Sequence, residues 1–219
     1  MNGTLIAAGR TIKTANCNGL FQKTEYDGLG RTVVSYTCFD ADETAYADAD
    51  DVTGDTVIEQ TNYYYDEAGR MVATASFQRL PDDAATTGAL DATNSYATAY
   101  VVWHDGLGRT VASVNYGRED VDSGLTHYFF DGTTGTLIDA NSDGIPDVAQ
   151  AAHPAPDTSD NYIVSLTDYD SAGRAYKTTD NLGRENWTVF DDLGRTVKTI
   201  QNYDDGTVEE TDADCDVTV

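Results

Sequence analysis

The chain of 219 residues has little positive charge and no long apolar run, and both shortages exclude classes of partner. Only 13 lysines and arginines stand against 38 aspartates and glutamates, for a formal net charge of -25. A surface of this sign repels nucleic acids and anionic membranes. No run approaches the roughly 18 apolar residues of a membrane-spanning helix, and no signal peptide is visible at the start. We therefore expect neither a nucleic-acid partner nor membrane insertion.

Catalytic signatures are also missing. The sequence contains no Gly-x-Ser-x-Gly, no phosphate-binding loop and no glycine-rich dinucleotide motif. Its three histidines, His104, His127 and His153, are not spaced as metal ligands. With 38 acidic residues, pairs of carboxylates occur everywhere and indicate nothing. The expectation is a protein without catalytic residues, not an enzyme.

A short motif ending in Gly-Arg recurs along the chain. Successive motif glycines are 21, 39, 39, 65, 10 and 11 residues apart, close to whole or half multiples of one unit. Asp180–Arg184 lacks the leading aromatic residue, and Leu5–Arg10 is a degenerate copy. The full copies, each an aromatic residue or histidine followed by Asp-x-x-Gly-Arg, are 26–31, 65–70, 104–109, 169–174 and 190–195.

Each motif position is readable as turn chemistry. Aspartate accepts hydrogen bonds from backbone N–H groups a few residues on, and glycine takes the positive φ that closes a tight turn. A run rich in β-branched residues then follows, as in Thr110–Val114. The pattern predicts an all-β fold of stacked antiparallel hairpins with a glycine bulge in each loop. The glycines expected at positive φ are Gly30, Gly69, Gly108, Gly173, Gly183 and Gly194.

Seven of the nine arginines occupy the motif position. Stacked hairpins would bring each guanidinium beside aspartates of its own and neighbouring turns, where its fork geometry suits carboxylates. We expect an electrostatic ladder along the sheet edge. The alternative, a solvated turn residue worth under about 1 kcal/mol, explains any one arginine but not seven.

The repeated Tyr-Asp-x-x-Gly-Arg units resemble the YD (RHS) repeat family over most of the chain. Known members are large exterior proteins, including toxin-enclosing bacterial shells, wall-associated proteins and animal adhesion receptors. The resemblance implies a spiralling sheet of β-hairpins, here a single domain over residues 1–219, at the cell surface or outside the cell. Shell members often end in a self-cleaving segment built around Asp-Pro. That dipeptide is absent, so neither proteolysis nor a released toxin carries over.

Two polar inserts interrupt the repeats, at about residues 77–99 and 117–161. The second contains oxygen-bearing residues at alternate positions with glycine at the sixth, the pattern by which a short loop encircles calcium. It resembles the calcium loops of thrombospondin type-3 and dockerin-like repeats. Gln150 stands where an EF-hand has its bidentate glutamate, so a modest affinity is expected; the alternative is a metal-free Asn/Asp/Gly turn. The expected ligands are Asp139, Asn141, Asp143, the Ile145 carbonyl and Asp147.

The three cysteines form no metal motif, and their odd number leaves at least one free or bonded between molecules. Cys17 and Cys38 each lie eight residues after a motif glycine, so they are equivalent positions two strands apart. That separation is roughly 9–10 Å, beyond the reach of a disulfide. We expect instead that Cys215 meets Cys17 or Cys38 of an adjoining subunit.

Three functions remain open. The chain is a structural subunit of a head-to-tail fibre or surface assembly, a segment of a larger shell that encloses cargo such as a toxin, or an adhesin-like module that binds glycans or a cell surface. A stack of hairpins leaves two open sheet edges that invite another chain, which favours self-association and the first function. Calcium is the expected cofactor, and glycans are candidate ligands.

Overall fold

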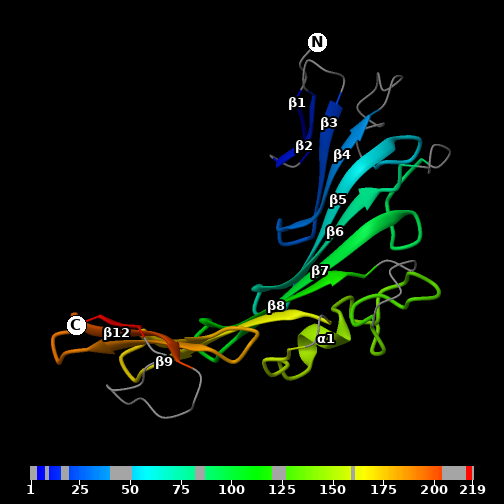
Figure 1. The fold of residues 1–219 in the computed structure, drawn as a ribbon. Helices are drawn as coiled ribbons and strands as arrows, with labels where there is room; N and C mark the ends of the chain where they lie inside the picture. Colours follow the sequence, from blue (N-terminus) through cyan, green and yellow to red (C-terminus); the bar gives the residue numbers. More distant parts are fainter. Residues whose placement is uncertain are drawn as a thin grey trace. The chain divides into compact units, whose positions relative to one another are not determined.

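The computed structural model describes residues 4–7, 10–15, 20–39, 51–81, 87–119, 127–158, 161–203 and 216–218. These residues form thirteen β-strands and one helix of a single turn, α1 (Asp147–Gln150). Figure 1 shows the fold as a ribbon. The predicted all-β class is confirmed. No helix in the described part of the chain is long and apolar enough to cross a bilayer.

Neighbouring strands in the sheet follow one another in chain order from β1 to β13, and the sheet is not closed. This order is the result of consecutive hairpins, and the hairpins β3–β4, β5–β6, β9–β10 and β11–β12 are all antiparallel. The strands are β1 (Thr4–Ala7), β2 (Arg10–Ala15), β3 (Leu20–Tyr26), β4 (Thr32–Phe39), β5 (Thr56–Tyr65), β6 (Met71–Arg79), β7 (Ser95–His104), β8 (Thr110–Arg118), β9 (Ile163–Tyr169), β10 (Ala175–Thr179), β11 (Glu185–Phe190), β12 (Thr196–Tyr203) and β13 (Asp216–Thr218).

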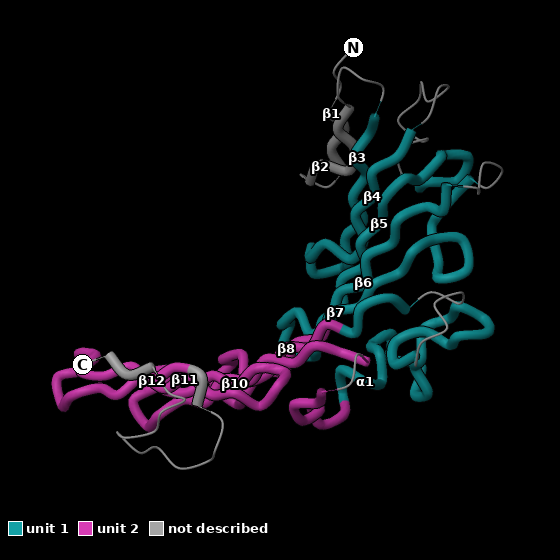
Figure 2. Tube along the Cα trace, viewed as in Figure 1, with its two compact units in different colours: residues 1–100, 116–150 teal, residues 101–115, 151–219 magenta. Residues whose placement is uncertain are grey.

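The chain forms two compact units, coloured separately in Figure 2. Unit 1 comprises residues 1–100 and 116–150, and unit 2 comprises residues 101–115 and 151–219. Strands β7 and β8 therefore contribute residues to both units.

One face of the sheet in unit 1 is apolar and buried. Small residues such as Ala75 and Ala97 are fully or almost fully buried there, and they leave room for the rings of an insert. Phe130 packs on Phe77 of β6 with 5.5 Å between the ring centroids, and Phe129 packs beside it at 5.0 Å. The insert between β8 and β9 thus supplies part of the core.

Unit 2 has a thinner interior. Between residues 163 and 201 only Val164, Thr179 and Ile200 are buried. Little apolar area is available to hold these strands, so strand pairing and the turns carry more of the stability there.

The bounds of the flanking strands give the extent of the two inserts. Because β6 runs to Arg79 and β7 begins at Ser95, the first insert is residues 80–94, shorter than the expected 77–99. The second occupies residues 119–162, close to the expected 117–161. A third long connection, residues 40–55 between β4 and β5, is described from residue 51 and was not expected from the sequence.

Candidate functional site: the aspartate–arginine turns

The motif turns share one backbone geometry. Between β3 and β4, the carbonyl of Asp27 accepts a hydrogen bond from the N–H of Gly30 at 2.9 Å. The N–H of Asp27 in turn donates to the carbonyl of Arg31 at 2.9 Å. Gly30 has a φ of 83°, a conformation that residues with a Cβ rarely adopt. This is a type I turn followed by a glycine bulge.

The same pair of backbone hydrogen bonds recurs in all six described turns. The glycines predicted at positive φ all have it, with φ between 80° and 83°. The prediction of bulged hairpin turns at the motif is therefore confirmed. The turns begin at Asp27, Asp66, Asp105, Asp170, Asp180 and Asp191.

The two oxygens of each motif carboxylate have different tasks. In the turn between β7 and β8, Oδ1 of Asp105 accepts the N–H groups of Leu107 and Arg109, both at 2.9 Å. Oδ2 accepts Nε of Arg109 at 2.7 Å and lies 2.6 Å from its Nη2. These bonds hold the pKa of Asp105 below its ordinary value, with the Arg109 N–H contributing most and its guanidinium next. The expected pairing of a motif arginine with its own aspartate is confirmed in the six described turns.

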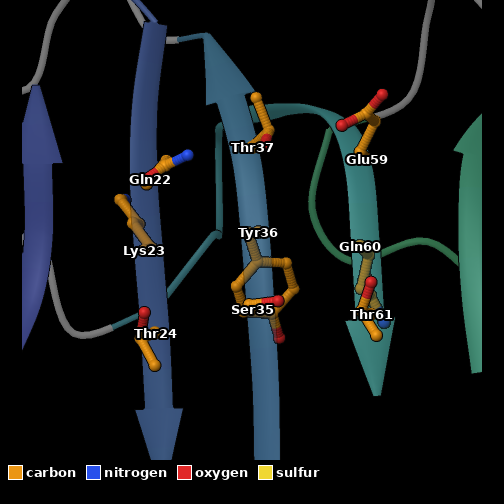
Figure 3. Close-up of a pocket in the computed structure, with 9 residues that line it drawn as sticks. All are labelled: Gln22, Lys23, Thr24, Ser35, Tyr36, Thr37, Glu59, Gln60 and Thr61. Carbon is orange, nitrogen blue, oxygen red and sulfur yellow. The ribbon is translucent and has the colours of Figure 1, made fainter. Parts of the chain in front are cut away.

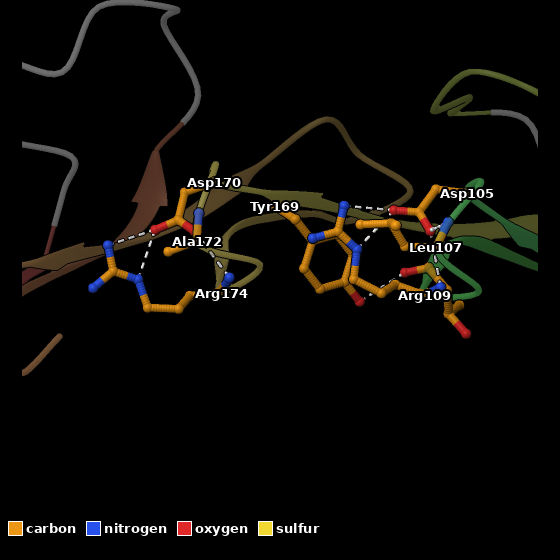
Figure 4. A network of polar contacts seen from close by, with 8 residues as sticks. Asp105, Leu107, Arg109, Tyr169, Asp170, Ala172 and Arg174 are labelled. Carbon is orange, nitrogen blue, oxygen red and sulfur yellow. Dashed lines mark hydrogen bonds and ion pairs between the residues drawn. The ribbon is translucent and has the colours of Figure 1, made fainter.

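The link from one turn to the next differs from the expected one. In unit 2 the guanidinium carbon of Arg109 lies 4.3 Å from the centroid of the Tyr169 ring, which begins the following motif (Figure 4). The Tyr169 hydroxyl donates to the carbonyl of Thr110 at 2.9 Å. The arginine therefore meets the aromatic ring of the neighbouring turn by a cation–π contact. We call this pair of residues a clasp.

The clasp recurs in both units. In unit 1, Arg31 lies 4.4 Å from the Tyr65 ring centroid, and the Tyr65 hydroxyl donates to the carbonyl of Thr32 at 2.8 Å. In unit 2, Arg174 lies 4.4 Å from the ring centroid of Phe190, which has no hydroxyl to add the second bond. At Tyr65, Tyr169 and Phe190 the aromatic residue of the motif, which the sequence identified only as the end of a strand, therefore stacks on the preceding motif arginine.

The motif without an aromatic residue, Asp180–Arg184, lies at the other ends of the unit 2 strands from the turns at Asp170 and Asp191. The turns at Asp170 and Asp191 join β9 to β10 and β11 to β12, whereas the turn at Asp180 joins β10 to β11. This explains the glycine intervals of 10 and 11 residues, each of which is one strand and one turn. The missing aromatic residue is the sequence signal that marks this turn as different.

Arg195 pairs with the aspartate of its own turn but stacks on no aromatic ring within the described residues. Its Nε donates to Oδ2 of Asp191 at 2.7 Å, as in the other turns. Its side chain is 73% exposed, against 29% for Arg109, and no ring covers it within the described residues. Arg195 and Arg109 therefore share the pair with aspartate and differ in the ring contact.

The expected calcium ligands lie in one loop that ends in α1. The carboxylate of Asp139 accepts the N–H of Gly144 at 2.8 Å, and that of Asp143 accepts the N–H of Ile145 at 2.8 Å. Nε2 of Gln150 lies 3.1 Å from both carboxylate oxygens of Asp143 and 3.2 Å from the Ile145 carbonyl. Gln150 thus reaches the loop from the position of the EF-hand glutamate.

The donor set of this loop is oxygen only, which suits calcium. Asn141 contributes its amide oxygen, which accepts the Asp143 N–H at 3.1 Å, and Asp147 accepts the Ala140 N–H at 3.2 Å. The described residues hold no cluster of three His, Cys, Asp or Glu side chains suited to an ion. An ion here would therefore depend on the neutral amide and carbonyl oxygens as well as on Asp139 and Asp143.

Three buried charged residues, Lys23, Asp55 and Glu119, were not expected from the sequence. Lys23 of β3 and Asp55, 3% and 2% exposed, form an ion pair of 2.6 Å that ties the third connection to the sheet. The carboxylate of Glu119 is fully buried and accepts the N–H groups of Tyr128 and Phe129 at 3.0 and 3.2 Å. Burial raises the pKa of Glu119. The Lys23–Asp55 pair joins a connection to a strand, whereas Glu119 holds together two parts of the second insert beside the core ring of Phe129.

The structure describes one of the three cysteines, Cys38. Cys17 and Cys215 lie outside the described residues. Cys38 is fully buried on β4, with its Sγ 3.8 Å from the Phe21 carbonyl. A cysteine of another subunit cannot reach Cys38 in this structure, so the Cys38 alternative is disfavoured and Cys17 remains.

No family model matches the chain, and no curated protein does either. Among solved structures, the crystal structure of TcdB2-TccC3 without its hypervariable C-terminal region is similar at 12% identity, with a TM-score of 0.28. A structure of TcdB2-TccC3 is similar at 14% identity, with a TM-score of 0.20. Both alignments cover 90% of this chain and 13% of the other chain, so this chain spans a small part of their length. Scores this low assign no role to this chain.

Proposed function

We propose that this chain is a non-enzymatic extracellular scaffold of RHS-like hairpins that assembles end to end. The clasped turns carry the proposal. The aspartate, arginine and aromatic residues of the motif are engaged with each other and with the backbone, as in Asp105, Arg109 and Tyr169. The most frequent charged feature of the sequence therefore serves to hold one hairpin on the next.

The strand order supports growth at the two ends. β1 and β13 are the first and last strands of the sheet, so each has a neighbour on one side only within the described chain. An unpaired strand edge presents a row of N–H and C=O groups that pairs readily with another strand. Addition of β1 of one copy to β13 of another would continue the antiparallel or parallel ladder without a new kind of contact.

Light scattering coupled to size-exclusion chromatography tests this assembly over a range of protein concentrations. We expect the mass to rise with concentration and negatively stained particles to be linear. Leu5→Pro and Ile6→Pro in β1 are tested separately, because neighbouring N–H groups of a strand point to opposite sides and proline removes one. One of them should abolish assembly while dichroism remains that of a β-protein.

The outcomes separate end-to-end assembly from a shell segment. A monomer at every concentration would contradict end-to-end assembly, and closed hollow particles would indicate a shell segment instead. Gels with and without reductant test the covalent link: a ladder of multimers that collapses on reduction supports a Cys215–Cys17 bond between copies. A Cys17→Ser variant that still shows the ladder would exclude that bond.

Calcium binding is a second proposal, for the loop of residues 139–150. The observation that favours it is that one short loop, turned at Gly144, brings together the side-chain oxygens of Asp139, Asn141 and Asp143. If bound, calcium would screen the Asp139 and Asp143 carboxylates from each other and fix the loop against the core.

A further inference from the structure

A row of buried side chains crosses the core side of β3, β4, β5 and β6. Strand pairing places Lys23 opposite Tyr36 and Tyr36 opposite Gln60, and Figure 3 shows these side chains on their strands. The row ends at Phe77 of the core, opposite Gln60. Lys23, Tyr36 and Gln60 are only 3%, 6% and 5% exposed. A lysine in such a row has its ammonium out of water and needs a charged partner.

The partner is Asp55, at the end of the connection between β4 and β5. Nζ of Lys23 lies 2.6 Å from Oδ2 of Asp55, and the Asp55 side chain is 2% exposed. The same Nζ donates to the Asp51 carbonyl at 2.8 Å. The backbone of Asp55 is held on both sides, because its N–H donates to the Val52 carbonyl at 3.0 Å and its carbonyl accepts the N–H of Gly88 at 2.9 Å. The fold therefore fixes the two groups against each other.

The Lys23–Asp55 contact is short, yet Oδ2 of Asp55 accepts no aligned hydrogen bond among the described residues. The carboxyl carbon is one bond beyond Oδ2, so Nζ stands near the separation of about 3–3.5 Å at which two reacting atoms meet. Lys177 and Asp168 of unit 2 form a pair of similar length, 2.8 Å, but their side chains are 21% and 49% exposed. The buried pair differs from this one in combining a short contact with nearly complete exclusion of water.

We propose that the side chains of Lys23 and Asp55 condense to an amide, a covalent cross-link within one chain. Nζ of Lys23 bonds to the carboxyl carbon of Asp55, and one carbon–oxygen bond of that carboxyl breaks. Of the three ammonium protons, one stays on the amide nitrogen and two leave with the released oxygen as water. The reaction consumes no oxidant, metal or cofactor, and the two charges cancel in the neutral product.

Burial favours this reaction in two ways. An ammonium and a carboxylate held out of water are costly, and transfer of one proton from Nζ to Oδ2 removes both charges and leaves a neutral amine that can attack. The fixed positions of the two groups also replace a chance encounter. Because Lys23 lies on β3 and Asp55 just before β5, the cross-link ties the connection to the sheet across the intervening β4. This inference concerns one chain and does not depend on end-to-end assembly.

Mass spectrometry of the purified chain, denatured after prolonged incubation at neutral pH, tests the cross-link. The intact chain should be lighter than its sequence mass by one water molecule. Trypsin does not cut after an acylated lysine, so residues 14–31, with Lys23 uncut, and residues 32–70 should be recovered as one linked peptide. The linked peptide is required, because a cyclic imide at an Asp-Gly pair would also lose one water. A chain of full sequence mass in which Lys23 is cut normally would overturn the proposal.

Two variants identify the reacting groups. Asp55→Asn offers the amine a carboxamide of the same shape, so the cross-link should form with loss of one ammonia molecule in place of water. Lys23→Arg keeps a cation beside Asp55 but has no amine that can be acylated, so it should have its full sequence mass. Loss of water in a folded Lys23→Arg chain would place the reaction elsewhere and contradict the assignment. If Asp55→Asn does not fold, the linked peptide of the wild type and Lys23→Arg decide.

The exposed pair of Lys177 and Asp168 is the matched control in the same digest. Trypsin should cut normally after Lys177, because solvent keeps both of its charges and the pair is not held out of water. An equal fraction of linked peptide at Lys177 and at Lys23 would show that burial does not select the pair, and it would overturn the inference.

Discussion

The guanidinium carbon of Arg109 lies 4.3 Å from the ring centroid of Tyr169, a residue 60 positions later in the chain. Arg195 makes the same bond to its own aspartate but is 73% exposed, with no ring over it in the described chain. Both arginines therefore pair with the aspartate of their own turn, but only Arg109 of the two also stacks on an aromatic ring in the described chain.

Comparison of Arg109→Ala with Arg195→Ala measures the clasp. Each variant loses an Asp–Arg pair worth about 0–1 kcal/mol. Arg109→Ala also loses its stacking on Tyr169, so it should cost roughly 0.5–1 kcal/mol more than Arg195→Ala. The free energy of unfolding in urea is the measurement. Equal losses in the two variants would mean that the ring contact contributes nothing.

Tyr169→Phe separates the ring from its hydroxyl. Phe190 stacks under Arg174 at 4.4 Å without a hydroxyl, so the ring alone is compatible with a clasp. The loss of the bond to the Thr110 carbonyl should cost about 0.5–1.5 kcal/mol. Tyr169→Ala should cost clearly more, since it also removes the stacking surface. If the two substitutions cost the same in urea unfolding, the stacking role is wrong.

Two glycines of one turn should respond with opposite signs to alanine. Gly108 has a φ of 81°, so Gly108→Ala should destabilise by about 1–3 kcal/mol through backbone strain. Gly106 is outside the left-handed region, and a Cβ there would meet nothing within 4 Å. Gly106→Ala should therefore be neutral or stabilising by up to about 1 kcal/mol. Melting temperatures of both variants check this, and a Gly108→Ala protein as stable as wild type would contradict it.

Acid should weaken the turns together. The pKa values of Asp27, Asp105, Asp170 and Asp191 are lowered from 3.8 in the folded chain, chiefly by the N–H of the motif arginine. Their stabilisation is complete above pH 3.8, the ordinary value, and is lost as the pH falls through the lowered folded values. Asp105→Asn should lower stability at neutral pH.

The same variant should also make the acid transition shallower. One fewer proton is taken up on unfolding, so the unfolding free energy falls less steeply as the pH drops below 3.8. Urea unfolding at a series of pH values gives this slope. A slope as steep as that of the wild type would show that Asp105 does not carry a lowered pKa.

Calcium binding can be tested with one variant that should remove it and another that should strengthen it. Calorimetric titration of chelator-treated protein should show a site with a Kd on the order of 10⁻⁴–10⁻³ M, which Asp143→Ala removes. Gln150→Glu places a carboxylate where an EF-hand has its bidentate ligand. This variant should bind at least tenfold more tightly. Absence of heat in the wild type, together with an unchanged melting temperature at millimolar calcium, would exclude the site.

The local part of this structure could be predicted from sequence because it is set within five residues. Asp105 and Arg109 belong to one turn, so their bond and the φ of Gly108 follow from the motif itself. The partner of Arg109 across the turns could not be read in the same way. It depends on which strands pair, and the sequence separation between Arg109 and Tyr169 includes a whole insert.

The buried charges were missed for a related reason. Lys23 occurs in a strand whose other residues are half-exposed, and nothing local indicates that its ammonium is buried. Its partner Asp55 lies in a connection that carries no repeat motif. Pairing of this kind is decided by tertiary contact, which removes the usual preference of lysine for the surface. The insert boundaries are similar, because β6 continues beyond the repeat to bury Phe77.

Short motif turns and long connections alternate along most of the chain, so the two lie at opposite ends of the strands. All clasps join turns that close hairpins within a repeat, whereas the long connections run between repeats, from β4 to β5, β6 to β7 and β8 to β9. A segment lengthened or exchanged between repeats therefore leaves the motif turns and their hydrogen-bond register unchanged. New loops, and the surfaces that they form, can therefore be added at these connections while the strand pairing stays the same. The short turn at Asp180, between β10 and β11, marks a place where no such addition has been made.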